Sequence, residues 1–100
     1  MKIACDVCIS NRSIKFLTQK GFDVVLKAGA GQPDKEWFAA ALELGATVFI
    51  SGDADIAFLV EKQYDKKIKW VNFAGMAYDE GKVNFWLLDR LNQLKEVWGL

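Results

Sequence analysis

The sequence predicts an α/β protein, a small three-layer α/β/α domain built on a parallel sheet of about four strands. Short β-prone runs alternate with longer segments of helical periodicity along the whole chain. The clearest run, residues 47–50, is apolar or β-prone throughout, as in a strand that is covered on both faces. Hydrophobic residues make up 52% of the 100 residues, so the chain can bury a sizeable core. We therefore expect one domain spanning residues 1–100.

The predicted strands are residues 2–7, 22–26, 47–51 and 68–73. Strands that alternate with helices form parallel sheets with right-handed crossovers, and the natural strand order for a unit of this size is 2-1-3-4. The order reverses between strands one and three, and ligands bind at such switch points in open α/β sheets. The carboxyl ends of these two strands are therefore the predicted site.

Capping residues mark the predicted helices. The first helix follows N-cap candidates at residues 10–13 and ends at Gly21, and the second begins at Pro33 and ends at Gly45. Apolar residues at helical spacing predict two more helices, one around residues 56–60 and one over residues 84–97. Residues 74–82 are predicted to be irregular.

Charge and composition exclude several kinds of chemistry. The net charge is zero, so the overall field gives no sign of a nucleic-acid partner. The chain has no histidine, which excludes Ser-His-Asp and Cys-His nucleophiles and histidine-ligated zinc. No apolar run approaches the length of a membrane span. Asp6 stands where a signal peptide needs its apolar region, so we expect a cytoplasmic protein without a membrane partner.

Five acidic residues stand at or just past predicted strand ends, or at the start of the second helix: Asp6, Asp34, Glu36, Asp53 and Asp55. Carboxylates gathered at one edge repel each other unless a cation binds them. Oxygen ligands of this kind suit Mg²⁺ or Mn²⁺. The alternative for four of them is helix capping or interaction with a helix dipole. Capping explains Asp6 poorly, because it stands near the end of an apolar central strand.

Two other groups of residues have weaker interpretations. Arg12 and Lys15 follow Asp6 closely and could contact a phosphate backbone, whereas the lysines of residues 62–69 are typical of a solvated face. Cys5 and Cys8 form a C-x-x-C pair. A redox pair or a metal-thiolate site is one interpretation. Burial as small apolar side chains is the other, and no further cysteine or histidine is available to complete a zinc site.

The order and spacing of several short motifs resemble the compact, minimal PIN-like domains of bacteria and archaea. These motifs are Asp6 at the end of the first strand, Gly-Phe-Asp-Val-Val at residues 21–25, Gln-Pro-Asp-Lys-Glu at residues 32–36, and Val-Phe-Ile-Ser-Gly-Asp-Ala-Asp-Ile at residues 48–56. The resemblance implies a metal-dependent ribonuclease, often the toxin of a toxin–antitoxin pair.

Carried over by position, Asp6 matches the family's first acid and Asp34 or Glu36 its second. Asp53 and Asp55 match the later acidic pair, and Ser51 stands at the polar position before it. The family usually has Glu-Asn directly after its first Asp, where this chain has Val7 and Cys8.

The sequence and the resemblance together lead to a hypothesis of an endoribonuclease that uses Mg²⁺ or Mn²⁺, with RNA as substrate and an antitoxin protein or a second copy of the chain as partner. The expected catalytic residues are Asp6, Asp34, Asp53 and Asp55, the expected metal ligands are Asp6, Glu36, Asp53 and Asp55, and the expected substrate contacts are Arg12, Lys15 and Ser51. A non-catalytic PIN-like interaction module is the first alternative. A receiver-like domain phosphorylated on Asp53 is the second.

Overall fold

A parallel four-stranded sheet forms the centre of the computed structural model, which describes residues 1–73 and 80–100. Its strands are β1 (Lys2–Cys5), β2 (Asp23–Lys27), β3 (Val48–Ser51) and β4 (Lys69–Asn72). They are ordered β2-β1-β3-β4, and every neighbouring pair is parallel. The predicted fold class and strand order are confirmed.

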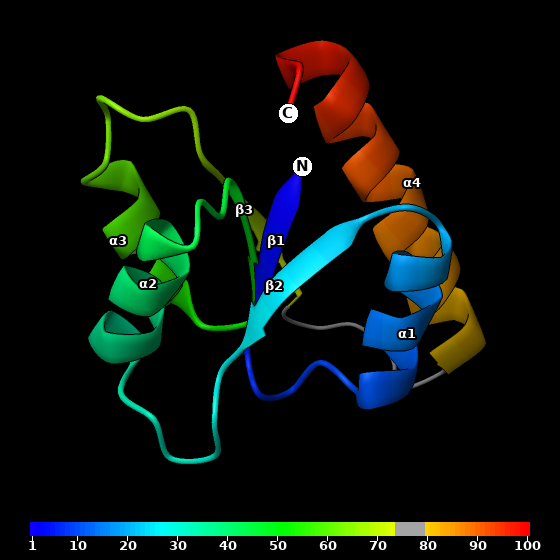
Figure 1. Cartoon of the computed structure of the whole chain (residues 1–100), viewed down its shortest axis with the longest axis horizontal. Coiled ribbons are helices and arrows are strands. Elements are labelled where there is room, and N and C mark those ends of the chain that lie inside the picture. The colour runs from blue at the N-terminus through cyan, green and yellow to red at the C-terminus, as the bar shows by residue number, and fades with distance from the viewer. Residues whose placement is uncertain (74–79) are drawn as a thin grey trace.

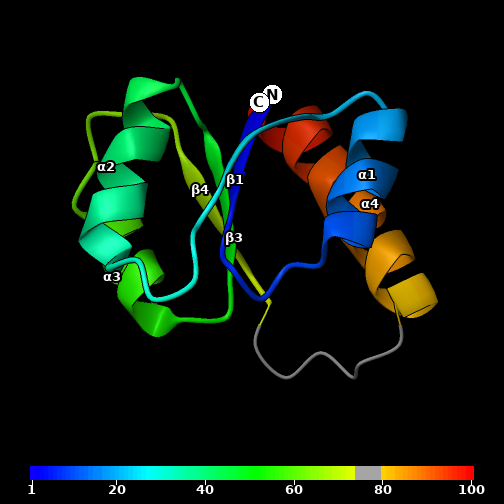
Figure 2. The ribbon, with the colours of Figure 1, turned by 60° about the horizontal axis from the view of Figure 1, so that its bottom comes forward.

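The helices are α1 (Asn11–Gln19), α2 (Asp34–Glu43), α3 (Ala54–Glu61) and α4 (Glu80–Trp98). Figure 1 shows how they alternate with the strands along the chain. In Figure 2 the sheet is seen nearly edge-on, with α2 and α3 on one face and α1 and α4 on the other. This is the three-layer α/β/α arrangement that the sequence predicts. Among the described residues, no helix has both the length and the hydrophobicity needed to cross a bilayer.

The predicted boundaries differ from the observed ones by a residue or more at several places, and the end of the first strand and the start of the last helix were wrong. The first strand ends at Cys5 rather than at residue 7, because the chain turns at Asp6. The Asp6 side chain accepts a hydrogen bond from the Val7 N–H, and its carbonyl accepts one from the Ile9 N–H. The last helix begins at Glu80, so residues 80–82 are helical and not irregular. The rest of the predicted irregular segment, residues 74–79, lies outside the described residues.

Side chains of the central strands alternate between two cores, as the period of a strand requires. Ile3, Cys5, Val48 and Ile50 pack in the core beneath α1 and α4. Ala4 and Phe49 belong to the core beneath α2 and α3. All six side chains are fully buried. A sheet covered on both faces explains why its central strands carry almost no polar residue.

Phe49 anchors the core on the side of α2. Its ring lies 4.6 Å from that of Phe38 and 6.3 Å from that of Trp37, between ring centroids. Gly45 follows the C-cap of α2 with a φ of +84°, a conformation that residues with a Cβ rarely adopt. These contacts fix α2 against the sheet, and its first residue, Asp34, is thereby placed at the sheet's carboxyl edge.

Candidate metal centre

The site begins where the two central strands end side by side. Cys5 of β1 is in register with Ile50 of β3, and the N–H of Asp6 donates to the carbonyl of Ile50 over 2.9 Å. Asp6 and Ser51 therefore lie side by side at the switch point between the two strands.

Ser51 forms hydrogen bonds to Asp6 at the end of the neighbouring strand and to Asp53 two residues later in the chain. Its side chain is fully buried, and its hydroxyl donates to Oδ2 of Asp6 over 2.6 Å. The Ser51 hydroxyl oxygen also accepts the backbone N–H of Asp53 over 3.0 Å. The indole N–H of Trp70 donates to the Ser51 carbonyl over 2.9 Å. The hydroxyl predicted to contact substrate is thus bonded to protein groups, and it holds Asp6 and the Asp53 backbone in place.

Asp53 is the N-cap of α3. Its Oδ1 accepts the backbone N–H of Asp55 over 2.9 Å, so the capping interpretation of this residue is confirmed. Capping occupies one acceptor direction, while a carboxylate has about four. Asp53 and Asp55 are both exposed and keep acceptor capacity toward solvent. A cap and a ligand are therefore compatible roles for Asp53.

Asp34 reaches the same place from α2. Its Oδ1 accepts the indole N–H of Trp37 over 3.2 Å. Partial burial raises the pKa of Asp34 from its ordinary value of 3.8, and the neighbouring carboxylates of Asp53 and Asp6 raise it further. The hydrogen bond from Trp37 acts in the opposite direction. Burial is therefore the main cause of the raised pKa, and the neighbouring carboxylates add to it.

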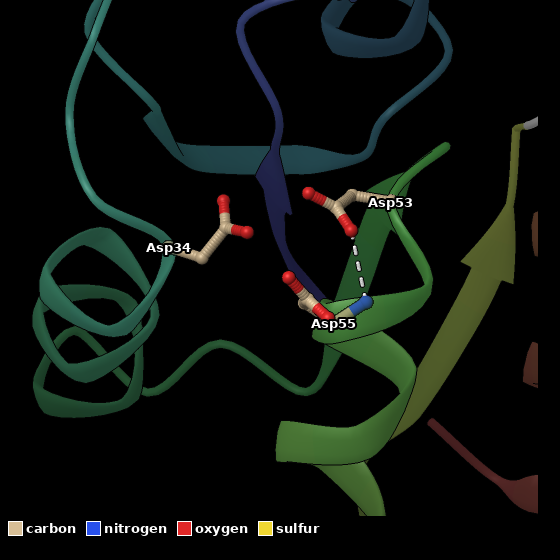
Figure 3. A group of neighbouring side chains, drawn as sticks. All are labelled: Asp34, Asp53 and Asp55. Carbon is tan, nitrogen blue, oxygen red and sulfur yellow. Dashed lines mark hydrogen bonds between the residues drawn. The ribbon is translucent and has the colours of Figure 1, made fainter.

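Figure 3 shows Asp34, Asp53 and Asp55 pointing toward one another across the space between α2 and α3. One carboxylate oxygen from each lies within 4.8 Å of the others. We call these three residues the acidic triad. Two oxygens bound to the same Mg²⁺ can be at most about 4.2 Å apart, given bonds of 2.0–2.1 Å. Small rotations of these side chains, or an intervening water, would bring the triad within that limit.

Asp6 and Glu36, two expected metal ligands, lie outside the acidic triad. Asp6 is near enough to raise the pKa of Asp34, but its two oxygens accept hydrogen bonds from Val7 and Ser51. Glu36 is exposed, and its Oε1 accepts a hydrogen bond from the side-chain amide of Gln32 over 3.2 Å. Glu36 therefore helps to order the loop before α2.

Arg12 and Lys15, the expected phosphate contacts, are exposed on α1. This helix belongs to the opposite layer from α2 and α3, which carry Asp34 and Asp55 (Figure 2). The structure thus brings together the later acids and the acid of α2, while Arg12 and Lys15 belong to the layer across the sheet.

Neither cysteine of the C-x-x-C pair has the lowered thiol pKa of a redox or metal-thiolate site. Burial raises the pKa of Cys5 to about 12. Partial burial, together with the charge of Asp6, raises the pKa of Cys8 as well. A redox-active or metal-binding thiol needs the opposite shift. The buried, apolar interpretation fits Cys5, while Cys8 is exposed.

Sequence reasoning missed the two tryptophans that support the site. Trp37 lies one helical turn after Asp34, so its spacing of three residues is the signal that could have paired them. Trp70 contacts Ser51 from the neighbouring strand, 19 residues away in sequence, and no local pattern indicates that contact.

A scan against protein-family models and searches of curated proteins and of solved structures returned no match to this chain. The assignment of function therefore depends on the geometry and chemistry of the acidic triad.

Proposed function

We propose that this protein is a nuclease that uses Mg²⁺ or Mn²⁺ to cleave RNA in the cytoplasm. One observation carries the proposal: three carboxylates from α2 and from the start of α3 converge within 4.8 Å at the carboxyl edge of the sheet. The neighbouring carboxylates of Asp53 and Asp6 are secondary contributors to the raised pKa of Asp34, and a divalent cation would relieve that part of the repulsion. The resemblance to minimal PIN-like domains agrees with this chemistry.

Asp34, Asp53 and Asp55 would hold the cation. Their carboxylate oxygens are the hard ligands that Mg²⁺ and Mn²⁺ take, usually with water and substrate phosphate completing the set. When bound, the ion supplies Lewis acidity, which activates a water and neutralises charge on a phosphodiester. The Ser51 hydroxyl donates to Asp6 and accepts the backbone N–H of Asp53, so it holds the Asp53 backbone in place. Since the chain has no histidine, proton transfers that the protein itself carries out would fall to carboxylates, lysines or cysteines.

The test is RNA cleavage in Mn²⁺ by wild type and by Asp53→Asn. Asparagine is as good an N-cap as aspartate, so this variant keeps the hydrogen bond to Asp55 and loses the charge. Loss of several kcal/mol of charge stabilisation predicts a fall in rate of about 100-fold or more.

Asp23→Asn is the matched control, because Asp23 is exposed at the start of β2, at the opposite edge of the sheet. It is expected to cleave like wild type. Equal cleavage by Asp53→Asn and wild type would rule out the proposed catalytic centre.

A non-catalytic interaction module is the second candidate. Val7 favours it, since an exposed apolar side chain follows Asp6 where the PIN-like family has a polar ligand. A folded protein that binds no Mn²⁺ would support the module and contradict the nuclease.

A further inference from the structure

A pocket of about 460 Å³ opens beside the acidic triad. Asp34 and Asp55 belong to both, so the pocket continues directly from the candidate metal centre. Lys35, at the start of α2, lines the pocket together with Phe58 of α3 and Lys62, the C-cap of that helix. The volume lies within the usual range for small-molecule sites, about 300–1,000 Å³. A polymer held at the triad would have one of its units next to this pocket.

Helical spacing builds one wall of the pocket. Asp55, Phe58, Leu59 and Lys62 all line it, at positions i, i+3, i+4 and i+7 of the α3 segment and the residue that caps it. Residues at this spacing share a face of a helix. The wall therefore presents a carboxylate at the triad, then an aromatic ring, then a cation, along about two turns.

Phe58 is the unusual member of this wall. Its side chain is 58% exposed, whereas Ile56, two residues earlier and on the opposite face of α3, is fully buried. The Lys62 ammonium lies 4.3 Å from the centre of its ring. An exposed contact of this kind is weak, and stacking of a nucleobase on an aromatic ring is stronger. A base can thus displace the ammonium from the ring, and the flexible lysine remains close enough to meet the adjoining phosphate.

We propose that this pocket binds one unpaired base of single-stranded RNA, stacked on Phe58, with Lys62 and Lys35 on the flanking phosphates. The inference rests on the proposed function, because it takes the nucleic-acid backbone to pass the acidic triad. Two lysines on the rim offset the repulsion that the acids exert on a phosphate. A requirement for an unpaired base follows from the stacking, since a base inside a duplex has no free face.

The test measures fluorescence anisotropy of a short fluorescein-labelled oligouridylate and of an RNA duplex, in EDTA and at low salt. Omitting the cation makes the affinity independent of cleavage. Phe58→Ala is expected to weaken single-strand binding by about fivefold or more, which is the size of one stacking contact. Phe58→Trp is expected to bind at least as well as wild type. Phe85→Ala is the control, because Phe85 is a similarly exposed phenylalanine on α4 in the opposite layer.

The proposed phosphate contact of Lys62 is tested by the salt dependence of the affinity for oligouridylate. Lys62→Gln is expected to reduce the slope of log affinity against log salt by about 0.7, the value for one phosphate contact on a single strand. Lys20→Gln is the matched control, since Lys20 also lies over a phenylalanine ring, that of Phe16 on α1. This control is expected to leave the slope unchanged.

Three results would each overturn the proposal: no binding of oligouridylate by wild type, equal affinities for Phe58→Ala and wild type, or an equal loss of duplex and single-strand binding in Phe58→Ala. The failure of the metal centre is separate from these, because it shows in Mn²⁺-dependent cleavage by Asp53→Asn. A protein that cleaves RNA yet binds oligouridylate equally well with and without Phe58 would keep the proposed function and lose the base pocket.

Discussion

The Ser51 hydroxyl donates to Oδ2 of Asp6 over 2.6 Å and so ties the carboxyl ends of the two central strands together. The residues are 45 positions apart in sequence, and the bond forms because β1 and β3 are neighbours. The same hydroxyl accepts the N–H of Asp53. A change at Ser51 therefore acts on the position of the Asp53 carboxylate as well as on the stability of the sheet.

Ser51→Ala is expected to lower the free energy of unfolding by about 1–3 kcal/mol, because it removes a hydrogen bond to a carboxylate and leaves the Asp53 N–H without that partner. Urea denaturation measures the loss. Thr18→Ala is the control: its hydroxyl bonds the Ile14 carbonyl on the exposed side of α1, and we expect a change within about 0.5 kcal/mol. Equal effects of the two substitutions would show that the Asp6–Ser51 bond has no special role.

Stability is expected to depend on pH through Asp34. Its pKa is raised in the folded protein, so the folded state holds this proton more tightly than the unfolded chain. The stabilising contribution is complete below the unfolded pKa, about 3.9, and is lost as the pH rises through the folded value. In EDTA at neutral pH, Asp34→Asn should therefore be more stable than Glu36→Gln, which removes a first-turn charge that lies outside the triad. The difference should shrink as the pH falls toward 4.

In EDTA at neutral pH, Asp34→Asn should also be more stable than wild type, because it removes the carboxylate whose charge is disfavoured in the folded state. Adding Mg²⁺ should make wild type the more stable of the two. A ligand that binds only the folded state stabilises it by about 2.7 kcal/mol at a hundredfold excess over Kd. Wild type gains this stabilisation, whereas the variant has lost a ligand of the triad. Thermal unfolding with and without Mg²⁺ measures the shift in Tm. The same increase in Tm for both proteins would remove Asp34 from the metal centre.

The thiols are expected to react slowly in the native protein. Cys5 is buried and its pKa is raised to about 12, so alkylation by iodoacetamide at pH 8 should reach it only after unfolding. Cys8 is exposed, but its raised pKa predicts slower alkylation than that of glutathione at the same pH. Mass spectrometry of native and urea-unfolded protein reads out both residues. Rapid alkylation of the two thiols in the native state would instead favour a redox pair.

The sequence was sufficient to predict the layers and the strand order, because both follow from periodic apolar patterns and from the handedness of crossovers. Phe49 shows why: its neighbours Val48 and Ile50 face the core beneath α1 and α4, so the alternation of a strand places Phe49 in the core beneath α2 and α3. The proximity of Asp34, Asp53 and Asp55 could be predicted in general terms, because the carboxyl ends of parallel strands lie at one edge of the sheet.

Side-chain direction could not be predicted in the same way. Asp34 and Glu36 are both in the first turn of α2, yet only Asp34 faces the triad, while Glu36 bonds Gln32. The choice between them depends on the rotation of α2, which the packing of Trp37 on the sheet decides. The pocket beside Phe58 could not be predicted for a related reason, because the residues of α2 that line it are distant from Phe58 in sequence.

Calorimetric titration of Mn²⁺ into the metal-free protein tests the central claim most directly. The acidic triad predicts saturable binding to wild type and to Asp23→Asn, and loss of that binding in Asp53→Asn, which retains its helix cap. The account is contradicted if correctly folded wild type binds no Mn²⁺, or if Asp53→Asn binds it as tightly as wild type does.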